Sequence, residues 1–574
     1  MFDLNPYQHD AVNAEGHCVV SACPGSGKTR VLSERAAKLL AADPQGRLCA
    51  VTFTRDAAME LRQRIIDTCA VNPARRLATG TFHSLALAQL RRDGSKKWRV
   101  IGSAEQQLLL RKAWEPHSHL ISFDDAQIAM DAIRSDDDAS DTTPGGIVTE
   151  IMQSYLALLR KMNALDFQEI LTETVRRLTA GILPPLPLRW MLVDEAQDMD
   201  GLQYAWVRAH ADAGVHITIV GDDDQSIYGW RHAMGYGGMK QFEQDYQAKS
   251  ICLPINYRCV PDILDPAARL ITYNKERIDK PIQAHRAPNH SPPVVKVFTN
   301  RIEESAEVAS VIANSPDPGT WAVLGRTNSL LDTVEAALFS RQLPYQRKGG
   351  SSVWETPAGS ALCGLLRCVV QDDAGSALQA LAWIGCPHSI LSSMAEHPHD
   401  HVIPQLDTVI STLDKRHDDA LSSLLTPLKS LRKLIPQWDT QIEANRVNLT
   451  IQGVAGWLLS YSDNQDETLL QCCTSALCRM DGPLPQRLQR TMLKDEKEAA
   501  GVSLLTMHSA KGLEFDNVWI VGAEQGVIPH IDGLVDEERR LFYVAMTRAR
   551  NHLVISRVLG DDLLPSQFLQ EAAL

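Results

Sequence analysis

The chain has 574 residues, of which 44% are hydrophobic and 22% charged, a balance typical of a globular protein with several domains rather than a disordered or fibrous one. Its formal net charge of −13 excludes a uniformly basic surface but leaves room for a local basic groove. There is no membrane-length apolar run, no secretion signal and no Cys-x-x-Cys pair, so we expect a cytoplasmic protein with buried thiols and no membrane partner.

Gln8 lies on a short predicted helix near the N-terminus, where its amide could pair with an adenine edge. A surface glutamine is the ordinary alternative for such a position.

The segment from Cys18 to Arg30 reads CVVSACPGSGKTR. An apolar strand leads into a glycine-containing turn, and Lys28 and Thr29 then begin a helix. Glycines let backbone N–H groups point at phosphate oxygens, the lysine can reach the β- and γ-phosphates, and the threonine hydroxyl can ligate Mg²⁺. The pattern predicts a phosphate cradle that consists of Ala22, Cys23, Pro24, Gly25, Ser26, Gly27, Lys28, Thr29 and Arg30.

Two further strands end in candidate ligand contacts. Phe53 follows the strand Leu48 to Thr52. Thr81 and His83 follow a third strand, in the segment ATGTFHS. Ligands of parallel α/β sheets bind beyond the carboxyl ends of the strands, so these side chains are candidates for the binding edge.

The pattern becomes helical from Leu85 to about Leu186, which indicates an insertion between core strands. The apolar strand WMLV then runs into Asp194 and Glu195. We expect Asp194 to hold the Mg²⁺ of a bound nucleotide, and Glu195 to orient or deprotonate the attacking water.

The next strand, ITIV, leads into GDDDQSIYGWR at residues 221–231. Gln225 could sense a γ-phosphate through its amide. Tyr228 and Trp230 put two aromatic rings on the same loop, and aromatic faces stack on unpaired bases. For Trp230, spacing alone leaves a buried anchor equally plausible.

These ordered motifs resemble those of superfamily one DNA helicases of the UvrD, Rep and PcrA type, and the resemblance covers essentially the whole chain. INYR at residues 255–258, LLTMHSAKGLEFD at 504–516 and EERRLFYVAMTRAR at 537–550 match the later motifs of that family. The resemblance implies an α/β fold with two RecA-like parallel-sheet motor domains, each interrupted by a mostly helical insertion. The implied motor domains are residues 1–84 with 187–252 and residues 253–358 with 501–574, and the implied insertions are residues 85–186 and 359–500.

The resemblance also implies roles for single residues. Arg258 and Arg548 match arginine fingers that face the γ-phosphate. Tyr257 matches the ring that stacks on adenine, and Glu514 the carboxylate that approaches the ribose. The residues implied to line a track for single-stranded DNA are Phe53, Thr81, His83, Tyr228, Trp230, Arg231, Arg326, Asn328 and His508.

The implied function is ATP- and Mg²⁺-dependent translocation on single-stranded DNA and unwinding at single/double-strand junctions, in repair, replication or recombination. The implied polarity is 3′ to 5′, and it comes from the resemblance alone. His232 departs from the family, which usually has glycine there. The second insertion is shorter than in full-length members, and Gly385 is the nearest candidate for their duplex-binding Gly-Ile-Gly turn.

The shortened insertion motivates an alternative. The chain would then be an ATPase subunit that senses DNA and regulates a separate nuclease or repair partner, similar to trimmed helicases found beside nucleases in bacterial phage-defence systems. A third hypothesis is an RNA motor, because base stacking does not distinguish the sugars.

Overall fold

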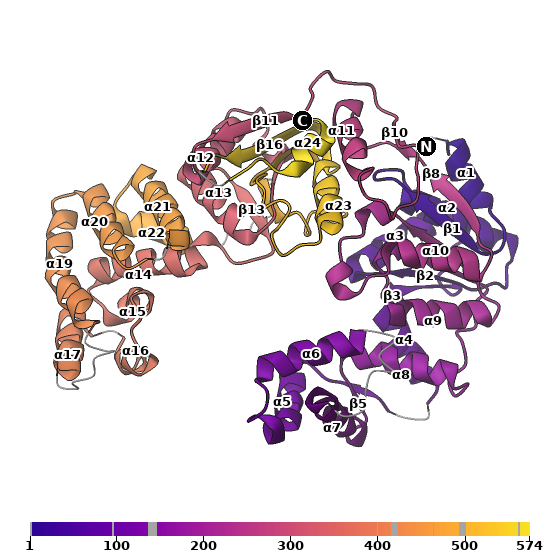
Figure 1. Ribbon diagram of the computed structural model, residues 1–574, viewed down its shortest axis with the longest axis horizontal. Coiled ribbons are helices and arrows are strands. Elements are labelled where there is room, and N and C mark those ends of the chain that lie inside the picture. The colour runs from indigo at the N-terminus through magenta and orange to yellow at the C-terminus, as the bar shows by residue number, and fades with distance from the viewer. Residues whose placement is uncertain are drawn as a thin grey trace. The chain divides into compact units, whose positions relative to one another are not determined.

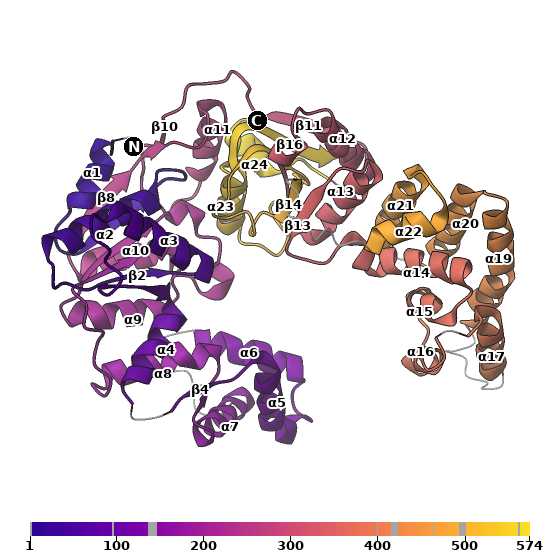
Figure 2. The same ribbon diagram turned by 180° about the vertical axis from the view of Figure 1, so that it is seen from behind.

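The structure is a computed structural model that describes residues 3–94, 97–135, 146–398, 400–414, 423–462, 464–492, 501–560 and 563–574. The chain divides into two compact units, residues 1–264 with 271–287 and residues 265–270 with 288–574. Each unit contains a six-stranded sheet, and Figures 1 and 2 show both sheets from opposite sides. The predicted α/β class with two parallel sheets is therefore confirmed.

All neighbouring strands of the first sheet are parallel, in the order β3-β2-β6-β7-β1-β8. These strands are β1 (Cys18–Ala22), β2 (Leu48–Thr52), β3 (Leu77–Thr81), β6 (Trp190–Val193), β7 (His216–Gly221) and β8 (Lys249–Leu253). β1, β2 and β6 are buried along their whole length. A strand covered on both faces reads as a continuous apolar run, which is why the sequence showed no alternation there.

Helices cover both faces of this sheet. They are α1 (Pro6–Asn13), α2 (Lys28–Ala42), α3 (Arg55–Thr68), α4 (Phe82–Arg92), α9 (Gly201–Asp212) and α10 (Gly235–Asp245). The residues of α11 (Pro261–Ile271) are divided between the two units. Val19 of β1 belongs to the same buried cluster as Trp206 of α9, whereas its neighbour Val20 belongs to a cluster with Leu32 of α2. Successive side chains of a strand point to opposite faces, so the two clusters are the cores on the two faces of this sheet.

The segment predicted as the first helical insertion is mostly helical. After α4 it contains β4 (Arg99–Val100), α5 (Ser103–Trp114), α6 (Phe123–Ser135), α7 (Ile147–Lys161), β5 (Ala164–Leu165) and α8 (Phe167–Thr179). Inside it the buried Asp166 accepts hydrogen bonds from Tyr155 and Arg134. This segment therefore has a small core of its own.

The first unit continues past residue 253, where the motifs placed a domain boundary. β9 (Ile255–Asn256) pairs with β10 (Gln283–Ala284), and the Asn256 side chain donates to the Pro24 carbonyl over 2.7 Å. These long-range contacts tie the segment to the phosphate cradle. The boundary predicted from the motifs and the boundary of the compact unit therefore differ.

The sheet of the second unit is also entirely parallel, in the order β11-β16-β15-β12-β14-β13. Its strands are β11 (Val294–Phe298), β12 (Trp321–Gly325), β13 (Tyr345–Lys348), β14 (Val502–Thr506), β15 (Phe515–Ile520) and β16 (Ala549–Val558). The helices beside it are α12 (Arg301–Ala313), α13 (Asn328–Ser340), α23 (Val535–Met546) and α24 (Gln567–Ala572).

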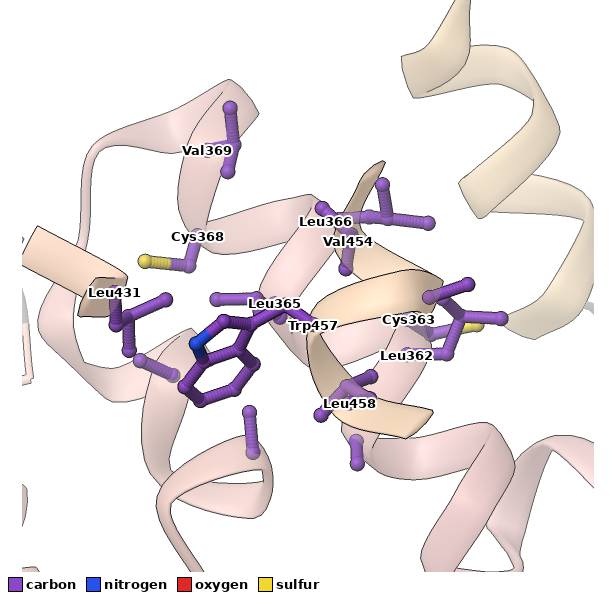
Figure 3. Packing of buried hydrophobic residues seen from close by; sticks show 14 of the residues in the cluster. Leu362, Cys363, Leu365, Leu366, Cys368, Val369, Leu431, Val454, Trp457 and Leu458 are labelled. Atoms are coloured by element: carbon purple, nitrogen blue, oxygen red, sulfur yellow. The ribbon is translucent and has the colours of Figure 1, made fainter. Parts of the chain in front are cut away.

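The helical part of the second unit contains the largest described core. Its helices are α14 (Pro357–Gln371), α15 (Ala374–Trp383), α16 (His388–Ala395), α17 (Val402–Asp414), α19 (Leu425–Glu443), α20 (Val447–Leu459), α21 (Asn464–Arg479) and α22 (Leu484–Met492). Figure 3 shows Trp457 and Leu458 of α20 among Leu362 and Leu365 of α14. No helix in the described part of the chain has the length and apolarity needed to cross a membrane.

Candidate active site

The turn after β1 forms a cradle that requires its glycines. Gly25 and Gly27 have φ angles of +61° and +82°, a region that other residues enter only with strain. A Cβ atom at Gly25 would lie 2.7 Å from the Cβ of Arg258, and one at Gly27 would lie 3.0 Å from the Nε2 of Gln8. The glycines therefore serve both the backbone conformation and close packing.

The cradle fits a phosphate. The Ser26 hydroxyl is buried and has no hydrogen-bond partner among the described residues. A buried polar atom without a partner costs free energy, which a phosphate oxygen would recover. Gly27 caps α2, whose first two residues are Lys28 and Thr29. The free N–H groups at the start of this helix can therefore bind the same phosphate.

Lys28 connects the cradle to the acidic pair after β6. Its Nζ lies 3.0 Å from the Oε2 of Glu195. Burial lowers the pKa of Lys28, but the carboxylates of Glu195, Asp222 and Asp194 outweigh burial and raise the pKa above its usual value. Lys28 is therefore charged and faces the carboxylate predicted to act on the attacking water.

Asp194 is held in surroundings that disfavour its charge. Burial first, and then the neighbouring Glu195, raise the pKa of Asp194 to about 7. A cation beside it would restore the ionised form, which fits Asp194 and Thr29 as the residues that would hold Mg²⁺. Glu195 itself has a φ of +51°, a left-handed conformation that costs a non-glycine residue about 1–2 kcal/mol.

A chain of hydrogen bonds leads from Glu195 to Gln225. The Gln197 side chain donates to Glu195 over 2.7 Å and accepts from the backbone N–H of Asp222 over 2.9 Å. The Gln225 amide then donates to the Asp222 carboxylate over 2.6 Å. The structure thus joins the predicted base and the predicted γ-phosphate sensor, which lie on different loops.

Gln8 and Tyr257, the two residues predicted to contact adenine, are linked through Asn5 beside the cradle. The Gln8 amide donates to the Ser26 carbonyl over 2.9 Å, and Gln8 also forms a capping box with Asn5. Asn5 donates to the Tyr257 hydroxyl over 2.8 Å, and the Tyr257 ring lies 4.6 Å from that of His285. Asn5 was missed by the sequence analysis, although Asn-x-x-Gln at a helix start is a recognisable capping signal.

Arg258 lies against the cradle within the same unit. Its backbone N–H donates to Asn256, and its carbonyl accepts from Arg286. The backbone N–H of Tyr257 donates to the Gly25 carbonyl over 2.9 Å, which fixes this segment on the cradle. Asn256 was not predicted as a site residue, because nothing in its local sequence marks a contact so distant in the chain.

Three of the residues predicted to contact DNA lie at the carboxyl ends of β2 and β3: Phe53 follows β2, Thr81 ends β3, and His83 lies in the first turn of α4. The Phe53 ring is 5.4 Å from that of Phe82, and Thr81 caps α4. His83 stacks on Phe167 with ring centroids 3.8 Å apart, and burial lowers the pKa of His83 to about 4. His83 is therefore neutral at pH 7 and does not act as a phosphate-binding cation.

Of the two predicted stacking rings on the loop after β7, Trp230 is exposed and Tyr228 is half-buried. Trp230 is 61% exposed, so it is not a buried anchor. The guanidinium of Arg231 lies 4.3 Å from the Trp230 ring and 5.8 Å from the Tyr228 ring. His232 has a φ of +60°, which explains physically why glycine suits this position.

The remaining predicted residues belong to the second unit. Arg326 follows β12, and its guanidinium pairs with Glu538 over 2.8 Å. Burial, and then Arg326, lower the pKa of His508 to about 4, so this histidine is also neutral. The Asn328 side chain accepts from Arg347 over 3.4 Å.

The predicted nucleotide contacts of the second unit are engaged with neighbouring groups of that unit. The Arg548 guanidinium donates to the carbonyls of Val544 and Leu513 over 2.8 and 3.2 Å. Glu514 pairs with Arg550. The predicted roles of Arg548 and Glu514 toward ATP require these contacts to be exchanged, and they stay predictions.

A phosphate cradle, an adjacent acidic pair and a glutamine-bearing loop at the carboxyl edge of a parallel sheet define a P-loop protein of the RecA-like class. The chain belongs to the UvrD/Rep helicase family: residues 4–247 match the UvrD/REP helicase N-terminal domain, and residues 251–389 and 411–559 match the UvrD-like helicase C-terminal domain. It is thus an ATP-dependent DNA helicase, as the sequence motifs predicted.

Individual relatives agree over nearly the whole chain. DNA helicase II of Haemophilus influenzae is 30% identical across 99% of this chain and 86% of that protein. The ATP-dependent DNA helicase Rep of Escherichia coli is 30% identical across 99% of this chain and 94% of its own length. The ATP-dependent DNA helicase PcrA of Leuconostoc citreum is 28% identical across 99% of this chain and 84% of that protein.

Proposed function

We propose that the chain hydrolyses ATP at the cradle of its first unit to move 3′ to 5′ along single-stranded DNA and to unwind duplexes at single/double-strand junctions. The ion pair between Lys28 and Glu195 is the observation that supports the ATP site, whereas the 3′ to 5′ polarity rests on the family resemblance alone. This ion pair joins the phosphate cradle to the acidic pair, although the two are far apart in the sequence. The setting we propose is DNA repair, replication or recombination.

Lys28 has two partners in this scheme. Without nucleotide it neutralises Glu195, and with ATP bound it turns to the β- and γ-phosphates. The freed Glu195 carboxylate then orients the attacking water and accepts its proton. Thr29 and Asp194 would hold Mg²⁺, which neutralises charge on the phosphates.

The other nucleotide contacts follow the same assignment. Gln225 senses the γ-phosphate, and Arg258 and Arg548 stabilise the charge that develops during hydrolysis. Gln8 and Tyr257 bind the adenine, and Glu514 approaches the ribose. The DNA track consists of Phe53, Thr81, His83, Tyr228, Trp230, Arg231, Arg326, Asn328 and His508.

The alternative role, as a regulatory subunit of a nuclease, has less support. The relatives described above carry the name of helicase themselves. No described contact of this chain favours a nuclease partner over autonomous unwinding. That alternative stays a prediction from the shortened insertion.

ATP hydrolysis by the purified chain, with and without single-stranded DNA, tests the proposal. Lys28→Ala and Glu195→Gln should each lower kcat by about 10²-fold or more, since each removes a group that acts on the reacting phosphate or water. Lys38→Ala is the matched control, because it removes an exposed lysine from the same helix. Full turnover by either site variant would refute the assignment.

Polarity needs its own substrates. Duplexes with a 3′ single-stranded tail should be unwound, whereas duplexes with only a 5′ tail should not. The reverse preference would refute the 3′ to 5′ direction and leave the ATP site untouched. Matched RNA tails distinguish a DNA motor from an RNA motor.

A further inference from the structure

The loop that carries Gln225 begins with three buried aspartates around one buried lysine. Asp222, Asp223 and Asp224 are at most 1% exposed, and their carboxylates are close enough together to hold a metal ion. The Nζ of Lys280 occupies that position, 2.7 Å from Asp222, 2.6 Å from Asp223 and 2.9 Å from Asp224. The Lys280 side chain is 0% exposed, so the ammonium group lies among these carboxylates away from bulk solvent.

Lys280 is charged in this cluster. Burial lowers its pKa, but the three carboxylates outweigh burial and hold the pKa well above the usual value for lysine. Buried charges are tolerated only when they are paired and hydrogen-bonded, and the ammonium group has three N–H donors for three acceptors.

The three aspartates differ in their other partners. Asp224 also pairs with Arg277 over 2.8 Å, and Asp223 also accepts from the backbone N–H of Ile278 over 2.6 Å. The Asp222 carboxylate also accepts from the side-chain amide of Gln225 over 2.6 Å. Its backbone N–H is bound to Gln197, which in turn donates to Glu195.

We propose that Lys280 is a positioning residue for ATP hydrolysis, which fixes Asp222 so that the Gln225 amide is held ready for the γ-phosphate. The inference rests on the proposed function, because it takes Gln225 as the phosphate sensor. Without the cation, three carboxylates in one buried site would repel one another, and Asp222 would move or take up a proton. A displacement of about 1 Å at a reacting centre can cost about a hundredfold in rate.

Asp222→Asn tests the link to Gln225 while it keeps the size of the side chain. An asparagine that accepts from Lys280 through its oxygen presents N–H donors toward the donating amide of Gln225, so the present bond is lost. We expect kcat to fall by about tenfold or more, with KM for ATP within about threefold of the wild type.

Asp224→Asn is the matched control. It makes the same chemical change in the same cluster, but its described partners are Lys280 and Arg277 rather than Gln225. We expect kcat within about threefold of the wild type, whatever the loss in thermal stability. Equal losses of kcat in both variants would show a merely structural cluster and overturn the proposal.

Lys280→Met alone would leave three buried carboxylates poorly compensated and could prevent folding. Lys280 is therefore tested in a double variant whose net charge equals that of the wild type. Lys280→Met combined with Asp223→Asn removes one charge of each sign. We expect its kcat to be about tenfold or more below that of Asp223→Asn alone. Equal kcat values in two folded proteins would overturn the role of Lys280.

Gln225→Ala separates failure of this inference from failure of the proposed function. If Gln225→Ala keeps full kcat, the assignment of Gln225 is wrong, and the proposed function fails at this residue. If it loses kcat while Asp222→Asn does not, only the positioning role is wrong. The double variant that combines Asp222→Asn with Gln225→Ala tests whether Asp222 acts through Gln225. If it does, the double variant loses less kcat than the product of the two single fold-losses. Losses of kcat that multiply would refute that route.

Discussion

Two neighbouring residues of this site, Glu195 and Asp194, have a backbone conformation and a carboxyl pKa that are unusual for their residue types. Glu195 adopts a left-handed backbone conformation, and the half-buried carboxyl of Asp194 beside it has a raised pKa. Such features persist only where the surrounding structure enforces them, and they cluster at functional sites. A hydrogen bond from Gln197 and an ion pair with Lys28 hold the Glu195 side chain in place here.

The raised pKa of Asp194 predicts a pH-dependent stability of the protein without nucleotide. Between the usual value of 3.8 and about 7, the folded state keeps a proton on Asp194 that the unfolded state has released. Stability from this group therefore falls as pH rises through that interval. Asp194→Asn should raise the thermal midpoint relative to the wild type, by an amount that grows from pH 4 to 7 and then stays constant.

The measurement is thermal unfolding without Mg²⁺ across this pH range. Asp10→Asn, which changes an exposed aspartate of the same unit, should show no such growing difference. A difference for Asp194→Asn that shrinks as pH rises would contradict the raised pKa. The same variant should lose ATP turnover, since it removes the proposed Mg²⁺ ligand.

Trp230 gives a second prediction at the residue scale. Its ring is 61% exposed, and Trp230→Ala should weaken single-stranded DNA binding by about 1–3 kcal/mol with ATP binding nearly unchanged. DNA-stimulated hydrolysis should fall in the same variant. Met59→Ala removes another exposed apolar side chain, 63% exposed, and serves as control. Unchanged DNA affinity of the Trp230 variant would exclude this ring from the track.

At the scale of elements, the start of α1 is part of the nucleotide site. The Asn5 side chain accepts from the backbone N–H of Gln8 over 2.8 Å and also donates to Tyr257. The helix cap therefore positions both residues that we assign to adenine. The loop after β7 has a similar double use, because it carries Gln225 and Trp230 within one short segment.

Asn5→Ala should affect both stability and ATP affinity. Loss of the cap costs about 0.5–2 kcal/mol, and release of Gln8 and Tyr257 should raise KM for ATP severalfold with a smaller change in kcat. Asn300→Ala removes an equivalent cap from α12, where Asn300 accepts from Glu303 over 2.9 Å. The control should lose stability without a change in KM; if both variants leave KM unchanged, the cap has no part in nucleotide binding.

On the scale of the whole molecule, the chain has two compact units with separate cores. Trp206 is 0% exposed in a core of the first unit, and Trp457 is 5% exposed in the helical core of the second. Units with separate cores need not unfold in a single transition. A substitution in the core of one unit can therefore destabilise that unit without destabilising the other.

Calorimetric unfolding should then show more than one transition. Trp206→Ala and Trp457→Ala should each destabilise their own unit by about 3–5 kcal/mol and lower different transitions. Each variant is the control for the other, because the chemical change is the same. A single transition lowered by both would show that the units unfold together.

Much of the fold was predictable because its signals are local. The buried strands at Leu48–Thr52 and Trp190–Val193 have the predicted bounds, since bounded apolar runs mark strands buried on both faces. The cradle could be predicted for the same reason, as its glycines, Lys28 and Thr29 are consecutive. The boundary at residue 253 differs from that of the compact unit, because β9 pairs with β10 from residues 283–284.

The sequence by itself therefore determined the family, the two sheets and the segments that carry the chemistry, because each is encoded in a short contiguous stretch. Only the tertiary structure decided that Trp230 is exposed, that His83 and His508 are neutral, and which residues hold the site together. Lys280 lies 58 residues from Asp222, and Glu538 lies 212 from Arg326. Such contacts follow from strand order and burial, for which neither partner carries a local signal.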